Sequence, residues 1–494
     1  MEFDHWDESL HLIELKLGSA HVLCQVLSMT DDDDEIRMIC AALEMVFRAP
    51  HDAVQEVFVQ VGTALVPLLL RLLERCESDN MKNADVSIMN ISKVFLYFSR
   101  VQQVRVPLAR QQGFLNTMVR VATSILNEES RILRLRIMAN LANANENKAI
   151  MLDHAGLLDS LLRVANLDLS VSAREFAAAT LMDLTIVPYN QVLMAENDKL
   201  IAVLIKLSLF DDEKEETREF AITALQNLAF AKENRKRLIN FGGGMVIEAL
   251  KKNLKSNPIY KARRRAAGTL TNLATEETAE KLGNHPGLLQ ALAVVSKMDG
   301  NNEVRERASL ALMKIANNIT SSMSCYSSLL DALVLSASDS NFSNFAAVMR
   351  SKTKNPENKV LIAKHEGVLE TLARISTSRQ STTKDRESAM KTIMHLTQNE
   401  TNRKMMANKL ILDAAIHCAN LKGFENENAR DAAIVALERL GTEMSNRKAM
   451  ANHEGLLVAI AQATEREAKA ERKGVEPQTE RLAKPLLMSL LLAL

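Results

Sequence analysis

Four polar side chains that could hold another polypeptide chain recur at intervals of 43 to 45 residues, and they are Asn140, Asp183, Asn227 and Asn272. Each lies two residues after a recurring apolar residue. A carboxamide has both a donor and an acceptor, so it can bond to an extended backbone running in either direction. The alternative is that each Asn bonds to the adjacent turn of its own chain. Because four consecutive units keep the pattern, we interpret it as a binding position, which we name the Asn position.

The Asn position becomes basic further along the chain, where it is occupied by Lys314, Arg350, His395 and Arg439. Residues four and seven positions earlier share its helix face. Those that we add to the predicted binding site are Arg136, Phe176, Phe220, Arg265, Arg307 and Lys391. The lining therefore changes from Asn and Phe to Lys and Arg, which predicts an acidic or phosphorylated extended partner segment. The alternative is that these residues are solvated charges on an exposed helix face, with no partner.

Seven arginines form a second series, each seven residues before the recurring apolar residue. They are Arg131, Arg174, Arg218, Arg263, Arg305, Arg386 and Arg430. They stand nine residues from the Asn position, which is about half a rotation around a helix of roughly 3.6 residues per turn. The two series therefore cannot share a face. We interpret the arginines as structural, bonding within their own unit or to the next one.

No motif in the chain predicts catalysis, a cofactor or a metal. Gly242, Gly243 and Gly244 lack the Lys-Ser/Thr that completes a phosphate loop. His154, His285, His365 and His453 recur in different units, too far apart to share one metal ion, so we interpret them as helix-end residues. The five cysteines show no pairing pattern and predict reduced, buried thiols. We expect a protein that is not an enzyme and binds no cofactor or metal.

All these series follow from eleven recurring apolar residues, which we name the landmarks. They are Leu43, Phe95, Met138, Leu181, Leu225, Leu270, Leu312, Val348, Ile393, Leu437 and Leu490. Most spacings lie in the low forties, which predicts a stack of like units, each packing on its neighbours. The composition, with 16 Gly and 9 Pro among 494 residues, favours helix.

One unit, residues 231–274, shows the expected elements. A short helix over 233–239 ends at the break 241–244, because Gly tolerates the left-handed backbone that ends a helix. A second helix is expected over 245–254 and a third over 259–274, where small and apolar residues recur at helical spacing. Other units repeat the glycine followed by an apolar pair, at Gly156, Gly287, Gly367 and Gly455.

This order of elements, with a third helix ending in Ala-Leu-Gln-Asn-Leu-Ala (224–229) or Thr-Leu-Thr-Asn-Leu-Ala (269–274), resembles the armadillo repeat. The arginine series adds features similar to the HEAT repeat. The resemblance implies an all-α, right-handed α-α superhelix of about eleven repeats, whose third helices line a concave groove that binds extended peptides. Importin-alpha-like grooves pair the Asn with a Trp four residues earlier, where this chain has Arg136, Ala179, Thr223 and Gly268, so basic transport signals are disfavoured. The basic trend is similar to that of beta-catenin-like grooves.

The resemblance leads us to expect a non-catalytic scaffold for an extended, acidic protein segment. The alternative is a regulator or chaperone of a folded partner such as a small GTPase or myosin. We expect one solenoid over 1–494, with divergent repeats over 1–130, regular repeats over 131–320, an irregular repeat over 321–354 and C-terminal repeats over 355–494. A charged insertion at 464–484 is expected to leave the solenoid surface.

Bulk properties set the remaining expectations. The 61 basic and 61 acidic residues balance, which gives no argument for nucleic acid or for a membrane surface. The acidic N-terminus is no signal peptide, and the ten apolar C-terminal residues are too few to span a bilayer. Reduced thiols indicate a cytoplasmic location, with the nucleus as a second compartment. The apolar segment Leu486 to Leu494 lacks a polar outer face, which predicts self-association or another partner there.

Overall fold

A computed structural model describes residues 3–48, 50–78, 84–120, 127–209, 212–322, 327–337, 342–472 and 483–493. Every regular element in these ranges is a helix. The chain divides into two compact units, Met1–Asn253 (unit 1) and Leu254–Leu494 (unit 2). The finer subdivision predicted from the sequence remains a prediction.

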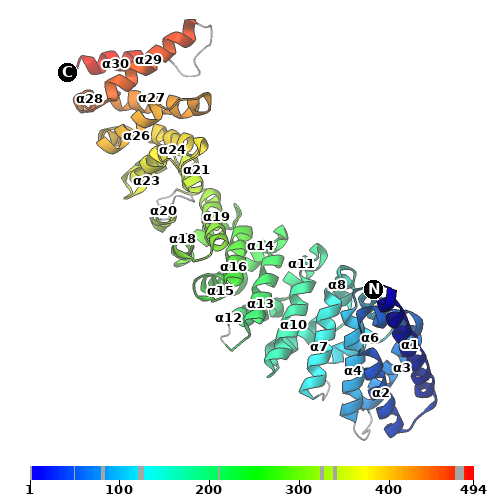
Figure 1. Ribbon diagram of the computed structural model, residues 1–494. Coiled ribbons are helices and arrows are strands. Elements are labelled where there is room, and N and C mark those ends of the chain that lie inside the picture. Colours follow the sequence, from blue (N-terminus) through cyan, green and yellow to red (C-terminus); the bar gives the residue numbers. More distant parts are fainter. Residues whose placement is uncertain are drawn as a thin grey trace. The chain divides into compact units, whose positions relative to one another are not determined.

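Unit 1 begins with long helices and continues with a regular three-helix repeat. Its helices are α1 (Phe3–Met29), α2 (Asp33–Phe47), α3 (His51–Ser78), α4 (Ala84–Arg100), α5 (Gln102–Ala109), α6 (Phe114–Val119), α7 (Glu128–Ala142), α8 (Asn145–Asp153), α9 (Leu157–Leu167), α10 (Val171–Leu184), α11 (Pro188–Ala195), α12 (Asp198–Leu209), α13 (Glu215–Leu228), α14 (Lys232–Asn240) and the 3-10 turn η2 (Phe241–Gly243). The third helices α4, α7, α10 and α13 lie side by side in chain order (Figure 1).

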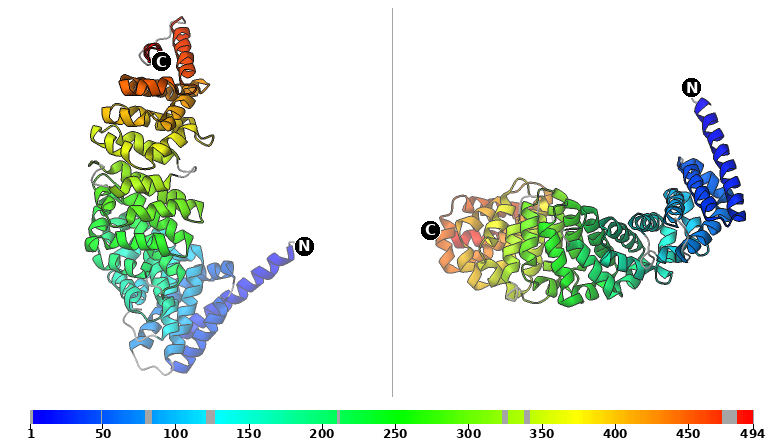
Figure 2. Two further views of the ribbon diagram at one scale, coloured as in Figure 1. Left: turned by 90° about the vertical axis from the view of Figure 1, so that its left-hand side faces the viewer. Right: turned by 90° about the horizontal axis from the view of Figure 1, so that it is seen from below.

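Helix α15 (Met245–Ser256) contains the boundary, and unit 2 repeats the same three-helix order. Its helices are α16 (Tyr260–Leu273), α17 (Ala279–Gly283), α18 (Leu288–Met298), α19 (Asn302–Asn318), α20 (Ser327–Ser336), α21 (Phe342–Lys352), α22 (Pro356–Lys364), α23 (Val368–Thr377), α24 (Thr383–Leu396), α25 (Glu400–Met406), α26 (Lys409–Ala419), η5 (Phe424–Asn426), α27 (Glu427–Thr442), α28 (Met444–Ala451), α29 (Leu456–Arg472) and α30 (Ala483–Leu491). Its third helices α16, α19, α21, α24 and α27 pack in that order, and Figure 2 shows the layers in green to orange. The repeat predicted over 231–274 is confirmed, and each unit is an all-α solenoid of three-helix repeats.

The landmarks form the repeated core of the fold. All eleven lie in helices and are at most 1% exposed. Each therefore sits at the centre of its repeat, where apolar burial stabilises the stack. The first landmark, Leu43, lies in α2, whose N-terminus is capped by the Asp32 side chain accepting from the backbone N–H groups of Asp34 and Glu35. This cap explains the acidic run at 31–35, because negative charge is favourable at a helix start.

Glycine makes the turn between the first and second helices. Gly156, Gly287, Gly367 and Gly455 have φ between 70° and 81°, which is the left-handed region. Each immediately precedes a second helix, at α9, α18, α23 and α29. The predicted glycine break is therefore confirmed, since other residues pay steric energy at this φ.

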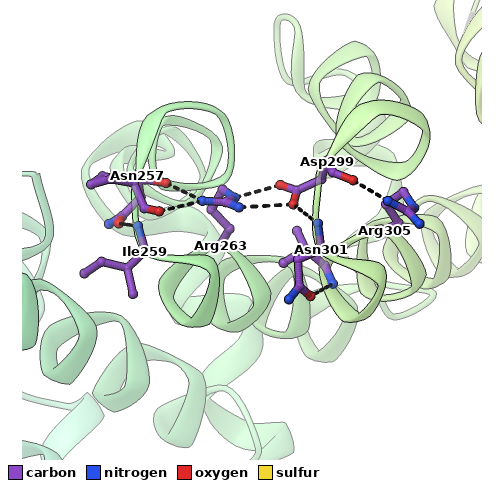
Figure 3. A network of polar contacts seen from close by, with 8 residues as sticks. Asn257, Ile259, Arg263, Asp299, Asn301 and Arg305 are labelled. Carbon is purple, nitrogen blue, oxygen red and sulfur yellow. Dashed lines mark hydrogen bonds and ion pairs between the residues drawn. The ribbon is translucent and has the colours of Figure 1, made fainter.

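The arginine series is structural, as predicted. Arg263 donates to the carbonyls of Asn257 and Pro258 before its own helix, and its guanidinium binds the carboxylate of Asp299 at 2.7 and 3.1 Å (Figure 3). Arg305 donates to the Asp299 carbonyl at 2.5 Å. In unit 1, Arg131 pairs with Asp168 at 2.6 Å and Arg174 pairs with Glu213 at 2.5 Å. Arg174 and Arg263 thus bond both to the loop before their own third helix and to a carboxylate of the next repeat, whereas Arg131 reaches the next repeat and Arg305 bonds to its own loop.

A buried Asn series in the first helices was missed by the sequence analysis. Its members are Asn147, Asn190, Asn234, Asn402 and Asn446, all at most 5% exposed. Each Nδ2 donates to a carbonyl six residues earlier, at the end of the preceding third helix, at 2.9 to 3.0 Å. It also donates to a carbonyl of the previous repeat at 2.8 to 3.0 Å. These bonds satisfy carbonyls that a helix end leaves without an intrahelical donor.

One prediction about the C-terminal region changes. The charged insertion was expected to leave the solenoid from Thr464, but α29 continues to Arg472, and residues 473–482 lie outside the described ranges. Arg466 donates to the Ala419 carbonyl at 2.7 Å, which holds this extension against the repeat before it. Helix α30 packs on α27, α28 and α29 through Leu486 and Leu490, whereas Met488, Leu491 and Leu492 stay exposed. Self-association through 486–494 remains a prediction.

The irregular repeat has short helices at the expected place. Helices α20 and α21 span 10 and 11 residues, and α21 packs between α19 and α24. Residues 323–326 and 338–341 of the predicted irregular repeat lie outside the described residues. By length and composition alone, one stretch in the described ranges, Asp52–Glu77 within α3, could span a membrane, and half of its apolar window is buried in the fold.

Candidate partner-binding face

The predicted site residues of unit 1 lie on third helices α7, α10 and α13. Arg136 is exposed, and its guanidinium carbon lies 5.9 Å from the centroid of the half-buried Phe176 ring on the next third helix. This cation–π contact shows that the positions four and seven residues before the Asn position face one another across repeats. Phe220 is also half-buried, at the corresponding position of α13.

Two asparagines of the predicted site bond to the preceding repeat. Asn140 Nδ2 donates to Ser99 Oγ at 2.9 Å, and Asn227 Nδ2 donates to Thr185 Oγ1 at 3.0 Å. Both side chains are half-buried, and these two bonds engage the Nδ2 nitrogen. The carboxamide therefore links neighbouring repeats, and its role in holding a partner backbone remains a prediction. Asn272, at the same position of α16, is also half-buried.

Asp183 differs from these asparagines because it is only 7% exposed. Burial raises the pKa of Asp183 to about 6, against the opposing effect of Lys148. Lys148 lies in α8, the first helix of the same repeat, and its own pKa is lowered by burial while the charge of Asp183 opposes that shift. Asp183 is thus an internal counter-charge, which makes it a poorer contact for an external chain than the sequence analysis assumed.

In unit 2 the predicted site residues are cations on α16, α19, α21, α24 and α27. Arg307 is exposed, and Lys314 is exposed with its Nζ donating to the Thr271 carbonyl at 3.4 Å. Arg265 is half-buried on α16. Arg350 and Lys391 share one carboxylate, Glu387, at 3.4 and 2.7 Å. Asp431 also acts on Lys391 electrostatically, so two nearby carboxylates balance the charge of these two cations in part.

His395 lies among four cations of the face and its neighbouring helices. Its Nδ1 lies 3.4 Å from Thr353 Oγ1, which repeats the geometry of Asn227 and Thr185. Burial lowers the pKa of His395, and the charges of Lys359, Arg350, Arg439 and Lys354 lower it further. Arg439 donates to the Met394 carbonyl at 2.8 Å, at the C-terminal end of α24. The imidazole therefore stays neutral at physiological pH, among cations.

Sequence reasoning missed a row of residues that flanks the Asn position. Three pairs of residues interact electrostatically: Lys148 with Asp183, Lys359 with His395, and Arg403 with Arg439. Each member of this row follows the buried Asn of a first helix and stands 35 or 36 residues before its neighbour on the third helix. The signal that could have found the row is the repeated Asn-Lys or Asn-Arg pair, at 147–148, 358–359 and 402–403.

The cavities of the two units lie away from this face. A cavity of about 950 Å³ lies between α1 and α2, lined by Leu15, Val22 and Met45 among others. Two smaller ones, of about 510 and 490 Å³, lie between second helices, at Arg163 and Lys206 and at Val334 and Arg374. None of the three is lined by a predicted site residue. In the described residues no group of three or more His, Cys, Asp or Glu could hold a metal ion.

The cysteines are packing residues where the structure describes them. Cys24, Cys40, Cys76 and Cys418 are free and buried, as predicted, and Cys325 lies outside the described ranges. Burial raises the pKa of the Cys418 thiol to about 12 and that of the Cys40 thiol to about 12. These thiols stay protonated at neutral pH, so they are poor nucleophiles.

Comparison with known proteins returns structures rather than families. No family model matches this chain, and no curated protein matches it. It is similar to computationally designed armadillo repeat proteins for modular peptide recognition, with 22% identity and a TM-score of 0.41 over 50% of this chain and 99% of that chain. It is also similar to a designed armadillo repeat protein in complex with the peptide (KR)4, with 22% identity and a TM-score of 0.43 over 50% of this chain and 99% of that chain.

Proposed function

We propose that this protein is a protein-binding scaffold, and that the third helices of unit 2 bind an extended acidic segment of a partner. We name the binding surface the unit 2 basic face and define it as Arg307, Lys314, Arg350, Lys391, His395 and Arg439. The observation that carries the proposal is the surplus of positive charge around His395, to which four cations contribute.

Nearby carboxylates balance the charge of these cations in part, with Glu438 beside Arg439 and Asp431 near Lys391. Lys314 and Arg439 donate to main-chain carbonyls, which are neutral. Arg350 and Lys391 share the single carboxylate of Glu387. Like charges held on one face repel, and an acidic segment would relieve that repulsion while forming charge-assisted hydrogen bonds.

The spacing of the cations suits an extended ligand. They lie on successive third helices, and packed helices are typically 8 to 10 Å apart. An extended chain rises about 3.3 Å per residue, so one repeat would match roughly two to three ligand residues. A partner segment with acidic residues at that interval could contact one cation per repeat.

The test is selection from a random peptide library on the full chain, followed by affinity measurement with variants. We expect acidic peptides to be enriched, and Arg350→Glu/Arg439→Glu to weaken their binding at least about tenfold, because each reversal replaces attraction with repulsion. The matched control is Lys364→Glu/Lys409→Glu, which changes the same charge at exposed residues of α22 and α26.

Neutral or basic selected peptides would refute the acidic partner. Equal losses in the two charge-reversed variants would show that only net charge matters, not the face. Asn140→Ala/Asn227→Ala tests unit 1 separately, since these side chains also bond to Ser99 and Thr185. Binding of a folded domain such as a nucleotide-loaded small GTPase, with no peptide binding, would select the alternative of a regulator of folded partners.

A further inference from the structure

One position of the repeat holds a carboxylate in a repeat of unit 1 and an imidazole in a repeat of unit 2. In unit 1 the position beside the first-helix cation Lys148 holds a carboxylate, Asp183, on the next third helix. In unit 2 the equivalent cation is Lys359, and the residue beside it is His395. The separations, 35 and 36 residues, show that these are the same places in the repeat. Lys148 thus has an internal counter-charge, whereas the equivalent residue beside Lys359 is neutral.

The other partners of Lys359 and His395 are also neutral. Lys359 Nζ donates to the side-chain oxygen of Gln398, and His395 contacts the Thr353 hydroxyl. Lys359 is only 8% exposed, and burial lowers its pKa, with the charge of Arg439 lowering it further. A nearly buried ammonium group without a carboxylate is costly, and an anion brought by a ligand would reduce that cost.

Neighbouring repeats add further cations at the same point. We name Arg350, Lys354, Lys359, His395 and Arg439 the cationic cluster; they come from α21, the loop after it, α22, α24 and α27. The carboxylates acting on the cluster are Glu387, which Arg350 shares with Lys391, and Glu438 beside Arg439. Four permanent positive charges therefore exceed the nearby negative charges.

We propose that the cationic cluster binds a phosphoryl group carried on a side chain of the extended partner segment, in the place that Asp183 occupies in unit 1. This inference rests on the proposed function and names the chemistry of one point within the same face. A phosphorylated side chain has about twice the charge of Asp or Glu and three acceptor oxygens. It can therefore contact guanidinium and ammonium groups of several repeats at once, which a single carboxylate does less well.

The first experiment asks whether the cluster binds phosphate. The full chain, labelled in its histidine rings, is titrated with phenyl phosphate while the His395 signal, assigned from His395→Gln, is followed by NMR. We expect a saturable shift and a rise in the pKa of His395, since a bound anion favours the protonated ring. Sodium chloride at matched ionic strength is the control. A response that chloride reproduces would overturn the proposal.

The second experiment replaces the histidine with the residue of unit 1. His395→Asp supplies the counter-charge internally, so we expect phenyl phosphate binding, measured by calorimetry, to fall at least about tenfold. Lys364→Gln, which also lowers the net charge by one at an exposed residue, is the control, and circular dichroism verifies that both variants are folded. Binding that His395→Asp leaves unchanged would overturn the proposal.

The third experiment identifies the source of the phosphoryl group. Peptides from the library selection are compared with Ser, Asp or phosphoserine at one position, and we expect phosphoserine to bind at least about tenfold more tightly than Asp. Equal binding of the three peptides would remove the phosphoryl site while leaving the acidic scaffold intact. If none of the three peptides binds, both the phosphoryl site and the acidic scaffold are refuted. Stronger capture by phosphoinositide vesicles than by the phosphopeptide would also overturn the proposal, by assigning the cluster to a lipid.

Discussion

At the residue scale, asparagine serves two distinct roles that share one repeat. Asn227, on a third helix, is half-buried and bonds to a threonine of the preceding repeat. Asn234, on a first helix, is 4% exposed and bonds to two main-chain carbonyls. Only the first kind leaves part of its carboxamide near solvent, so only the first kind is placed to contact a partner.

The buried asparagines should matter more for stability than exposed ones. Asn402→Ala removes bonds to the Leu396 and Lys359 carbonyls, and both acceptors stay buried. We expect the free energy of unfolding to fall by about 2 kcal/mol, the typical cost of unsatisfied buried polar groups. Hydrogen exchange of α24 and α25 amides measures it. Asn420→Ala, at an exposed position after α26, is the control and should change little. Equal losses of stability in Asn402→Ala and Asn420→Ala would contradict the structural role of the buried asparagine.

At the element scale, the turn glycines are equivalent in backbone conformation but not in surroundings. Gly367 and Gly455 have φ of 81° and 79°. A Cβ on Gly367 would lie 2.8 Å from Val334 Cγ1, whereas one on Gly455 would meet nothing within 4 Å. The same turn is therefore set by φ alone in one repeat and by φ and close packing in another.

This difference predicts unequal effects of one substitution. Gly455→Ala should cost about 1 kcal/mol, because a left-handed backbone strains any residue with a Cβ. Gly367→Ala should cost roughly 1 kcal/mol more, from overpacking against Val334. Urea unfolding compares the two variants, and Val334→Ala in the Gly367→Ala background should recover the difference. No recovery would indicate that the close contact is not the cause.

The ion pair between Arg263 and Asp299, which joins neighbouring repeats, should make the stability of the fold depend on pH. Burial alone would raise the pKa of Asp299, but the hydrogen bond from Arg263, the Asn301 N–H and the charges of Arg263 and Arg305 outweigh it, so the pKa falls below 3.8. A lowered folded-state pKa stabilises the fold above the unfolded pKa, and this contribution disappears as pH falls through the folded pKa.

Arg263→Gln should therefore reduce the free energy of unfolding by about 2 to 3 kcal/mol near pH 6, because it leaves a mostly buried carboxylate without its partner. The difference from wild type should shrink below about pH 4, as Asp299 protonates in both proteins. Arg264→Gln is the neighbouring control, since its pair with Glu303 is more exposed and worth little. A difference independent of pH would contradict the role of the charge pair.

At the scale of the whole molecule, contacts run between neighbouring repeats. Bonds of the buried Asn series reach back 42 or 43 residues, which is one repeat. Stability in such a stack is the sum of local repeat terms and interfaces between neighbours. A partner bound across several repeats would therefore stabilise those repeats first.

This organisation predicts local rather than global effects of a substitution. Asn190→Ala in unit 1 should raise hydrogen exchange in α8, α10 and α11, which adjoin the lost bonds to Lys148 and Leu184. Exchange in α24 to α27 of unit 2 should stay unchanged, and Asn446→Ala should give the reverse pattern. Uniform acceleration across both units would show one cooperative block.

The sequence by itself determined the repeat, the helix order, the glycine turns and the structural role of the arginines. These features depend on period, on helical spacing and on the steric freedom of glycine, all of which are local properties of the chain. Eleven landmarks at most 1% exposed confirm the period. The continuation of α29 past Thr464 escaped prediction because charged residues are good helix formers and carry no local stop signal before Gly474.

Only the tertiary structure decided which polar residues are structural and which are placed to bind. The hydroxyls that contact Asn227 and His395 come from the preceding repeat, 42 residues earlier in the chain. The cations beside Asp183 and His395 come from the first helix of the same repeat, 35 and 36 residues earlier. Electrostatic energy depends on distance and burial in space, which neither composition nor spacing reports. The balanced sequence of 61 basic and 61 acidic residues therefore conceals one buried carboxylate in unit 1 and a cluster of cations at the equivalent place in unit 2.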